Sequence, residues 1–364
     1  MHKSTGVAAL RSLRGQLLTI PDLRPVYANW TAGLSPYCDE LRAFVEENIN
    51  KYVKDEKAKK KTKAIDLGWF ASLTYPDAEL EQLKTIALMS MIFFIFDDTI
   101  DKEIEDDTPD FASDFDLATK LRQESIACMR YLFSQDGSKA SSNRRAPRVP
   151  QEFASIEAFA PRVTAATRGR IDLDKLGDDF QEFIEANAIE QAFRLSGNLP
   201  DIKEYWSYRH GVGAVFPYCT MSQYVHNIAL PDSLAWCEEV QIMRLETSAQ
   251  PLICNDLYSL KKEMYEDTPT NLVPIMIAES GKSLDSVVEE LVQGMYASAQ
   301  SFDTAAASLR AKGLEYDEKV QAQLEKFIGA FESFQTGCFE FFMNSKRFGV
   351  KQYKQKDGSY IIPL

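Results

Sequence analysis

The sequence predicts an all-α protein, and three observations support this. The 364 residues include few helix-breaking residues, 15 Pro and 17 Gly. The long stretches between them repeat apolar residues at helical spacing rather than alternating as strands do. Hydrophobic residues make up 45% of the chain and aromatics 11%, enough for a large aromatic interior. We expect helices at roughly 36–53, 78–102, 116–134, 174–195, 201–222, 232–266, 283–310 and 317–346.

Polar segments and a capping residue mark the ends of some of these helices. The lysine-rich stretch 54–63 and the segment 137–150 are charged and poor in large apolar residues, so we expect two exposed loops. Ser283 suits the N-cap of the helix 283–310, because its side chain can accept a hydrogen bond from the first turn. Each of these signals agrees with the helical spacing around it.

Composition and charge exclude several classes of function. The net charge of -13 opposes binding to nucleic acid or to an anionic membrane, because both need a positive field. The chain has three His and neither a G-x-S-x-G nor an H-E-x-x-H pattern, so serine and zinc catalysis are unsupported. Its six Cys are scattered without a C-x-x-C pair, which indicates reduced thiols.

No boundary divides the chain, so we expect one domain over residues 1–364, in which the conformations of segment 1–35 and tail 349–364 are not predicted. The first 20 residues lack a sustained apolar core with a cleavage site, and the apolar run 86–96 is far shorter than the roughly 20 residues of a membrane span. We therefore expect a cytoplasmic protein without a membrane span, either monomeric or homodimeric.

An acidic cluster ends the most apolar helix. After the run 86–96 the sequence continues Asp97-Asp98-Thr99-Ile100-Asp101. Asp97 and Asp101 are four residues apart on one helix face, where two carboxylates repel unless a cation lies beside them. Hard oxygen ligands of this kind suit Mg²⁺. The alternative is that these acids merely face solvent, which the nearby acids Glu103, Glu105, Asp106 and Asp107 would support.

A second set of oxygen ligands lies at 255–263, where the sequence is NDLYSLKKE. Asn255, Ser259 and Glu263 are spaced by four residues, so each lies about 40° from the next around a helix and all three form one stripe. A carboxamide, a hydroxyl and a carboxylate together can bind a second hard cation. Lys262 adds a positive charge within reach of a phosphate. The alternative is an ordinary polar helix face.

Together these segments resemble the aspartate-rich motif and the N-D-x-x-S-x-x-x-E motif of class I terpene synthases, particularly those of fungi and bacteria. In that family an arginine 46 residues before the Asn senses the diphosphate, and Arg209 stands at that position. The resemblance implies a helix break after it, with Gly213 offering a carbonyl to the cation. The alternative for Arg209 is a surface ion pair with Glu204 or Asp201.

The resemblance extends to the C-terminal region. Family members commonly show G-N-x-x-W-S-x-x-S-x-R-Y, and this chain has GCFEFFMNSKRF, in which Gly337, Ser345 and Arg347 match. The planar guanidinium of Arg347 can bind a phosphate through two hydrogen bonds. Phe348 replaces the usual tyrosine, whose hydroxyl is therefore absent. Tyr353 could take its place only if the tail folds back.

This resemblance implies a helical bundle around a central apolar cavity, in which three Mg²⁺ ions, Arg209, Lys262 and Arg347 neutralise the leaving diphosphate. A linear isoprenyl diphosphate, with farnesyl diphosphate favoured by the size of the chain, would be ionised and cyclised to a sesquiterpene. The implied metal ligands are Asp97, Asp98, Asp101, Asn255, Ser259 and Glu263. Candidates for contact with the isoprenyl chain are Ser90, Phe93, Phe94, Phe216, Tyr218 and Phe341. The alternative for each, and the commoner role of a buried aromatic residue, is ordinary core packing.

Several alternatives stay open. Geranyl and geranylgeranyl diphosphate cyclases resemble farnesyl diphosphate cyclases, and the sequence does not show the depth of the cavity. A prenyl-chain elongating synthase would need a second aspartate-rich motif where this chain has NDLYSLKKE. A catalytically inactive ligand-binding or scaffold protein could keep the same fold.

Overall fold

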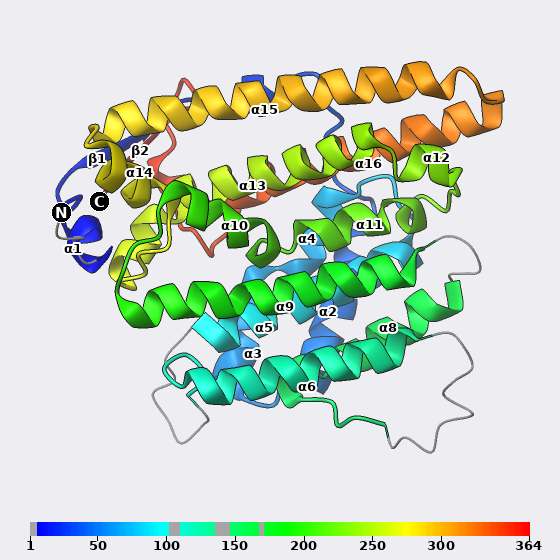
Figure 1. Cartoon of the computed structure of the whole chain (residues 1–364), viewed down its shortest axis with the longest axis horizontal. Helices are drawn as coiled ribbons and strands as arrows, with labels where there is room; N and C mark the ends of the chain where they lie inside the picture. Colours follow the sequence, from blue (N-terminus) through cyan, green and yellow to red (C-terminus); the bar gives the residue numbers. More distant parts are fainter. Residues whose placement is uncertain (1–5, 102–109, 135–145, 167–170) are drawn as a thin grey trace.

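The all-α prediction is confirmed. The computed structural model describes residues 6–101, 110–134, 146–166 and 171–364, and these form helices with one small two-stranded sheet. Figure 1 shows the long helices lying side by side in layers, with α15 along one edge and α6 toward the other. In the described ranges, no helix combines the length and apolar character needed to cross a membrane.

The eight predicted ranges all fall on helices, and the structure adds shorter ones. The longer α-helices are α2 (Cys38–Tyr52), α5 (Leu80–Asp101), α6 (Phe115–Phe133), α9 (Leu173–Ser196), α13 (Glu238–Tyr265), α15 (Leu284–Gly313) and α16 (Glu318–Asn344). The shorter ones are α1 (Gly6–Arg11), α3 (Glu56–Ile65), α4 (Leu67–Thr74), α8 (Ile156–Ala166), α10 (Ile202–Val212), α11 (Val215–Val225), α12 (Asp232–Ala235) and α14 (Leu272–Ser280). Three 3₁₀ turns are η1 (Arg24–Tyr27), η2 (Gln151–Phe153) and η3 (Lys351–Tyr353).

The loop expected at 54–63 is wrong, because most of this stretch forms α3. Asp55 caps the helix by accepting a hydrogen bond from the Ala58 N–H at 2.6 Å. Thr62 and Ile65 are buried on one side of the helix, and the lysines occupy other positions around it. Lysine is a good helix former, so a basic stretch with a cap and one buried face folds as a helix. Of the loop expected at 137–150, residues 137–145 lie outside the described residues, and 146–150 contain no helix or strand.

The range 201–222 divides into two helices at a sharp break. Arg209 lies in the last turn of α10, Gly213 caps it, and Ala214 takes a left-handed conformation with φ 52° before α11 begins. A Cβ atom at Gly213 would collide with the side chain of Leu252 on α13. Glycine therefore permits the close approach of the Leu252 side chain, which would have to shift to admit a Cβ atom. At the break, the carbonyls of Arg209 and Gly211 accept from the N–H groups of Gly213 and Ala214.

The two ends of the chain pair with each other. Strands β1 (Leu17–Ile20) and β2 (Tyr360–Pro363) form an antiparallel sheet in which Leu18 lies opposite Ile362. Leu18, Ile20, Tyr360 and Ile362 are buried beneath it. Figure 1 shows β1 and β2 close to α14, so the tail that follows α16 ends at the same end of the bundle as β1.

Helices α4 and α16, both of which line the cavity described below, are in close contact. A Cβ atom added to Gly337 in α16 would lie 2.5 Å from the carbonyl oxygen of Leu73 in α4. Backbone atoms cannot move aside as the end of a flexible side chain can, so the two helices must separate to admit it. The glycine shared with the terpene synthase motif is thus explained by packing.

We expect Gly337→Ala to lower the free energy of unfolding by about 1–3 kcal/mol, because the added methyl group overpacks this contact. Gly294→Ala in α15 is the matched control, since its new Cβ meets no atom within 4 Å. The control should stabilise the protein by about 0.5–1 kcal/mol, because alanine is the better helix former. Denaturant unfolding measures both, and equal stability of the two variants would contradict this packing.

Candidate active site

A cavity of about 840 Å³ lies between α4, α5, α9, α10, α11, α13 and α16. Its apolar part is lined by aromatic side chains and its rim by charged and polar ones. Of the residues predicted from the sequence, those that line it are Phe93, Phe94, Asp97, Asp98, Arg209, Gly213, Tyr218, Asn255, Ser259, Lys262, Glu263, Phe341 and Arg347. The structure therefore brings both predicted motifs and the three predicted basic residues to one cavity.

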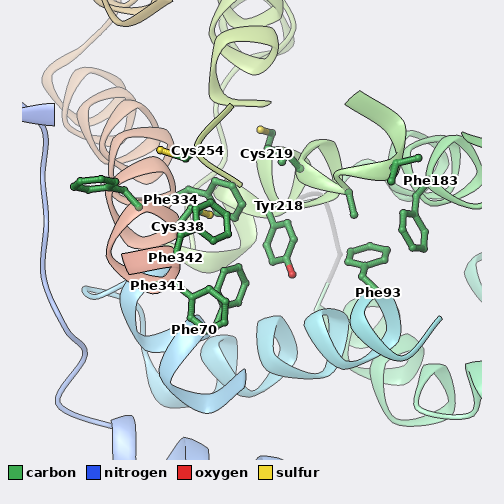
Figure 2. Packing of buried hydrophobic residues seen from close by; sticks show 14 of the residues in the cluster. Phe70, Phe93, Phe183, Tyr218, Cys219, Cys254, Phe334, Cys338, Phe341 and Phe342 are labelled. Atoms are coloured by element: carbon green, nitrogen blue, oxygen red, sulfur yellow. The ribbon is translucent and has the colours of Figure 1, made fainter. Parts of the chain in front are cut away.

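The apolar part is built from rings on several helices (Figure 2). Phe93 on α5 contacts Phe183 on α9, with ring centroids 4.8 Å apart. Phe341 on α16 contacts Phe70 on α4 at 5.0 Å. Phe334 also lines the cavity. Sequence analysis missed Phe70, Phe183 and Phe334, because buried phenylalanines that pack only with protein show the same apolar spacing.

Two of the predicted contacts lie outside the lining of this cavity. Ser90 is fully buried, and its hydroxyl oxygen lies 2.8 Å from that of Tyr218, so it is behind the lining rather than in it. Phe216 stacks on His210, with centroids 6.0 Å apart, and lies beneath the guanidinium of Arg244. Phe216 and Tyr218 are two residues apart in α11, so they face opposite sides of that helix.

The acidic end of α5 faces basic side chains. Arg347 lies within 3.2 Å of a carboxylate oxygen of Asp98 and 4.0 Å of one of Asp97, and its guanidinium covers the ring of Phe94 at 5.5 Å. Lys61 from α3 also reaches Asp98, at 3.4 Å. Asp101 ends α5, but its side chain lies outside the described residues, as do Glu103, Glu105, Asp106 and Asp107.

The stripe on α13 presents oxygen atoms to the cavity. The hydroxyl of Ser259 is buried without a well-formed hydrogen bond among the described residues, and it lies beside the Glu263 carboxyl group, whose pKa it lowers. Glu263 accepts a hydrogen bond from Asn271 at 2.7 Å, and burial, followed by the charge of Asp256, raises the pKa of its carboxyl group. A divalent cation would satisfy the Ser259 oxygen and favour the ionised form of Glu263, so these residues fit a metal site.

Such a cation would depend on amide and hydroxyl oxygens as well as on carboxylates. In the part of the chain that the structure describes, no three His, Cys, Asp or Glu side chains gather closely enough to hold a metal ion by themselves. On α13, Asn255 would supply an amide oxygen and Ser259 a hydroxyl oxygen in addition to the carboxylate of Glu263. Lys262, on the same rim, pairs with Glu266 at 3.4 Å.

Arg209 is held in place by a buried network between α10 and α13. Its guanidinium donates to Asp256 at 2.8 Å, to Asn255 at 3.0 Å and to the hydroxyl of Tyr205 at 2.9 Å. Tyr205 in turn donates to the other oxygen of Asp256 at 2.5 Å. Sequence analysis missed Asp256 and Tyr205. The signal was present, since Asp256 follows Asn255 directly and Tyr205 lies one turn before Arg209.

The alternative pairing of Arg209 with Glu204 or Asp201 is wrong. Asp201 is the N-cap of α10 and accepts from the Glu204 N–H at 2.7 Å, while the Glu204 carboxylate accepts from the Asp201 N–H at 2.8 Å. These two acids therefore satisfy each other's backbone groups in a capping box. They lie at the N-terminal end of α10, whereas Arg209 lies in its last turn.

The position where the family motif has a tyrosine is occupied by Phe348 and is apolar. Phe348 lines the cavity and packs its ring against Phe342 at 5.3 Å. Tyr353 does fold back with the tail, but its ring lies under the ammonium group of Lys261 at 4.9 Å. Tyr353 is not among the residues that line the cavity, so it does not supply the hydroxyl that Phe348 lacks.

Comparison with known proteins agrees with this geometry. Residues 89–299 match the family model described as terpene synthase family 2, C-terminal metal binding. The sesquiterpene cyclase hepA of Aspergillus oryzae is 22% identical over 358 residues, which cover 96% of this chain and 95% of that protein. The terpene cyclase braA of Annulohypoxylon truncatum is 25% identical over 357 residues, covering 96% and 90%.

Solved structures share the fold. The linalool/nerolidol synthase of Streptomyces clavuligerus superposes with a TM-score of 0.70 at 18% identity, covering 86% of this chain and 98% of that one. The germacradien-4-ol synthase of Streptomyces citricolor gives 0.69 at 17% identity, covering 86% and 96%. At these identities the likeness concerns the helical architecture.

We expect Asp256→Ala to lower the free energy of unfolding by about 3–5 kcal/mol, because it leaves the buried guanidinium of Arg209 without its carboxylate. Asp201→Ala, at the N-cap of α10, is the matched control. It should lower the free energy of unfolding by about 1 kcal/mol, the typical contribution of an N-cap. Denaturant unfolding distinguishes them. A cost for Asp256→Ala no larger than that of the control would show that Arg209 does not depend on this carboxylate.

His210, next to Arg209, predicts a pH dependence of stability. Burial, followed by the charge of Arg209, lowers the pKa of its imidazole to about 4, and its Nδ1 lies 2.9 Å from the Ser248 hydroxyl. Because the folded pKa lies below the unfolded value, the stabilisation is complete above about pH 6.5 and is lost as the pH falls toward 4. From pH 7 to pH 5 the wild type should lose about 1–2 kcal/mol more unfolding free energy than His210→Gln. Identical losses would contradict the depressed pKa.

Proposed function

The chain belongs to the terpene synthases, and from this premise we propose that it ionises and cyclises farnesyl diphosphate in a Mg²⁺-dependent reaction that releases diphosphate. The observation that best supports the proposal is that the cavity has a charged, polar rim and an apolar, aromatic interior. Two sets of oxygen ligands and three basic side chains occupy its rim, and aromatic rings line the space beneath them. A diphosphate fits the rim, and an isoprenyl chain fits the apolar part.

The proposed metal ligands are the side chains that the resemblance implied. Asp97, Asp98 and Asp101 would hold Mg²⁺ at the end of α5, and Asn255, Ser259 and Glu263 would hold it on α13. The buried Ser259 hydroxyl, which lacks a well-formed hydrogen bond and lies beside the Glu263 carboxyl group, supports the α13 site. When bound, three Mg²⁺ ions would neutralise the charge that develops on the leaving diphosphate.

The basic residues of the chain bind and orient the diphosphate in this proposal. Arg209, held by Asp256, presents a fixed guanidinium, while Lys262 and Arg347 add charge on either side of the rim. Their ion pairs with Glu266 and Asp98 would exchange for contacts with phosphate oxygens. Donors held in place before the reaction stabilise the departing charge most effectively, because they need no reorganisation.

The apolar part protects and guides the allylic cation. Gly213 lies at the helix break, where its carbonyl can face positive charge, and the rings of Phe93, Phe94, Tyr218 and Phe341 surround the cavity. Aromatic faces attract cations and exclude the water that would quench them. The released diphosphate can accept a proton in the final step, so no separate catalytic base is required.

The relatives favour farnesyl diphosphate among the possible substrates. The chain aligns over nearly the whole length of a protein named as a sesquiterpene cyclase, and sesquiterpenes derive from the 15-carbon diphosphate. We also propose that residues 1–364 act as one catalytic domain, since the paired termini pack beside the helices that carry the site. An inactive scaffold is disfavoured, because both ligand stripes and Arg209 face the cavity.

Incubation of the purified protein with geranyl, farnesyl and geranylgeranyl diphosphates, each with and without Mg²⁺, tests this function. We expect a cyclic product from farnesyl diphosphate that requires Mg²⁺, detected by gas chromatography and mass spectrometry. A cyclic product from another diphosphate would correct the chain length. No product from any of the three, with the protein folded, would refute the activity.

We expect Asn255→Ala and Asp97→Ala each to lower turnover by roughly 10²–10³-fold or more, because each removes an oxygen ligand at the rim. Asn50→Ala, on the exposed face of α2, is the matched control and should keep full turnover. Circular dichroism checks that all three variants remain helical. Full activity of either rim variant in the presence of Mg²⁺ would remove the metal assignment.

A further inference from the structure

Tyr218 is the aromatic residue that lies between the two sides of the cavity. It is 4% exposed, and its ring centroid lies 4.8 Å from that of Phe334 on α16 and 6.0 Å from those of Phe70 on α4 and Phe93 on α5. Figure 2 shows its ring between these side chains, with the hydroxyl oxygen pointing toward α5. The orientation of this ring therefore shapes the apolar part of the cavity.

Both ends of Tyr218 are anchored by hydrogen bonds. The hydroxyl of Tyr75 donates to the Tyr218 carbonyl at 2.8 Å. At the other end, the Tyr218 and Ser90 hydroxyl oxygens lie 2.8 Å apart, and Ser90 donates to the carbonyl of Ile86 at 2.9 Å. A carbonyl can only accept, and serine has one proton, so Tyr218 is the donor to Ser90. The direction of the phenol is thereby fixed.

The position of Ser90 places this anchor well below the rim. Ser90 precedes Asp97 by seven residues, so it lies on the same stripe of α5 and about 10 Å further along the helix axis. Because Tyr218 covers it, Ser90 does not line the cavity although it points the same way as Asp97. Tyr218 therefore forms the floor on which the end of the isoprenyl chain remote from the diphosphate would rest.

We propose that Ser90 is a positioning residue and Tyr218 a specificity-determining residue for cyclisation, and that their hydrogen bond fixes the conformation in which the isoprenyl chain is held when the diphosphate leaves. This inference rests on the proposed function. The product of an allylic cation depends on which double bond lies within reach of it, and that is set by the shape of the enclosing wall. A floor that can tilt admits more than one folded chain and therefore more than one product.

A second hydroxyl pair between the same two helices provides the control. The hydroxyl oxygens of Thr85 on α5 and Tyr224 on α11 lie 2.9 Å apart, and both residues are buried. Thr85 precedes Ser90 by five residues, and Tyr224 follows Tyr218 by six. Neither Thr85 nor Tyr224 lines the cavity. Loss of either pair removes one buried hydrogen bond between α5 and α11. Only loss of the Ser90 pair releases a ring that lines the cavity, that of Tyr218.

The test is the product distribution of Ser90→Ala, Tyr218→Phe, the double variant, and the controls Thr85→Ala and Tyr224→Phe, with farnesyl diphosphate and Mg²⁺. We expect the ratio of principal to minor products to fall about fivefold or more in each Ser90 and Tyr218 variant, with little change in KM because the rim is untouched. Ser90→Ala should add nothing in the Tyr218→Phe background, since both remove one interaction. The controls should keep the wild-type ratio.

Three outcomes would overturn the inference. The ratio could stay unchanged in both single variants, the controls could shift it equally, or Ser90→Ala could shift it further in the Tyr218→Phe background. Tyr218→Phe keeps the ring, so it remains decisive if Ser90→Ala fails to fold. Absence of product from the wild type would refute the proposed function itself, whereas an active wild type with unaffected variants would overturn only the role of this pair.

Discussion

The structure depends most on the buried ion pair between Arg209 and Asp256. A buried guanidinium without a carboxylate is costly, so the pair forces α10 and α13 into one relative position. That position brings the helix break at Gly213 against Leu252 and turns the stripe of Asn255 and its neighbours toward the end of α5. One charge pair thus connects the helix that we propose binds diphosphate with the helices that would hold metal.

The second constraint is that a polar rim and an apolar cavity must lie on the same helices. On α5 the change occurs within one turn, from Phe93 and Phe94 to Asp97 and Asp98. Below the break, α11 is held by two hydroxyl pairs to α5 and by the hydrogen bond from Tyr75. Its Thr220 also joins a buried network with Asp179 on α9 and Arg244 on α13. Rigid packing below the break keeps the apolar wall constant while ion pairs at the rim can exchange for substrate contacts.

The sequence predicted the long helices and the rim, but less of the wall and of the supporting contacts. Helical periodicity located the long helices, yet a basic composition hid α3, whose Lys61 reaches Asp98 from 37 positions away. The acidic end of α5 and the stripe on α13 were found because their chemistry is unusual for a helix face, whereas Arg209 and Arg347 were found through the resemblance to terpene synthases. Phe334 and Phe183 were not, because cavity and core phenylalanines look alike in sequence, and Phe216 was placed on the wrong side of α11. Local spacing defines a helix face, whereas its neighbours are set by tertiary packing.

In the proposed reaction, the rim of this cavity binds diphosphate and Mg²⁺ together. Calorimetric titration of the protein with inorganic diphosphate, first without and then with Mg²⁺, tests it without requiring turnover. We expect saturable binding of diphosphate that is much tighter with Mg²⁺. By thermodynamic reciprocity, Mg²⁺ should then bind more tightly when diphosphate is present. Equal affinity with and without Mg²⁺, or no binding in its presence, would contradict the account.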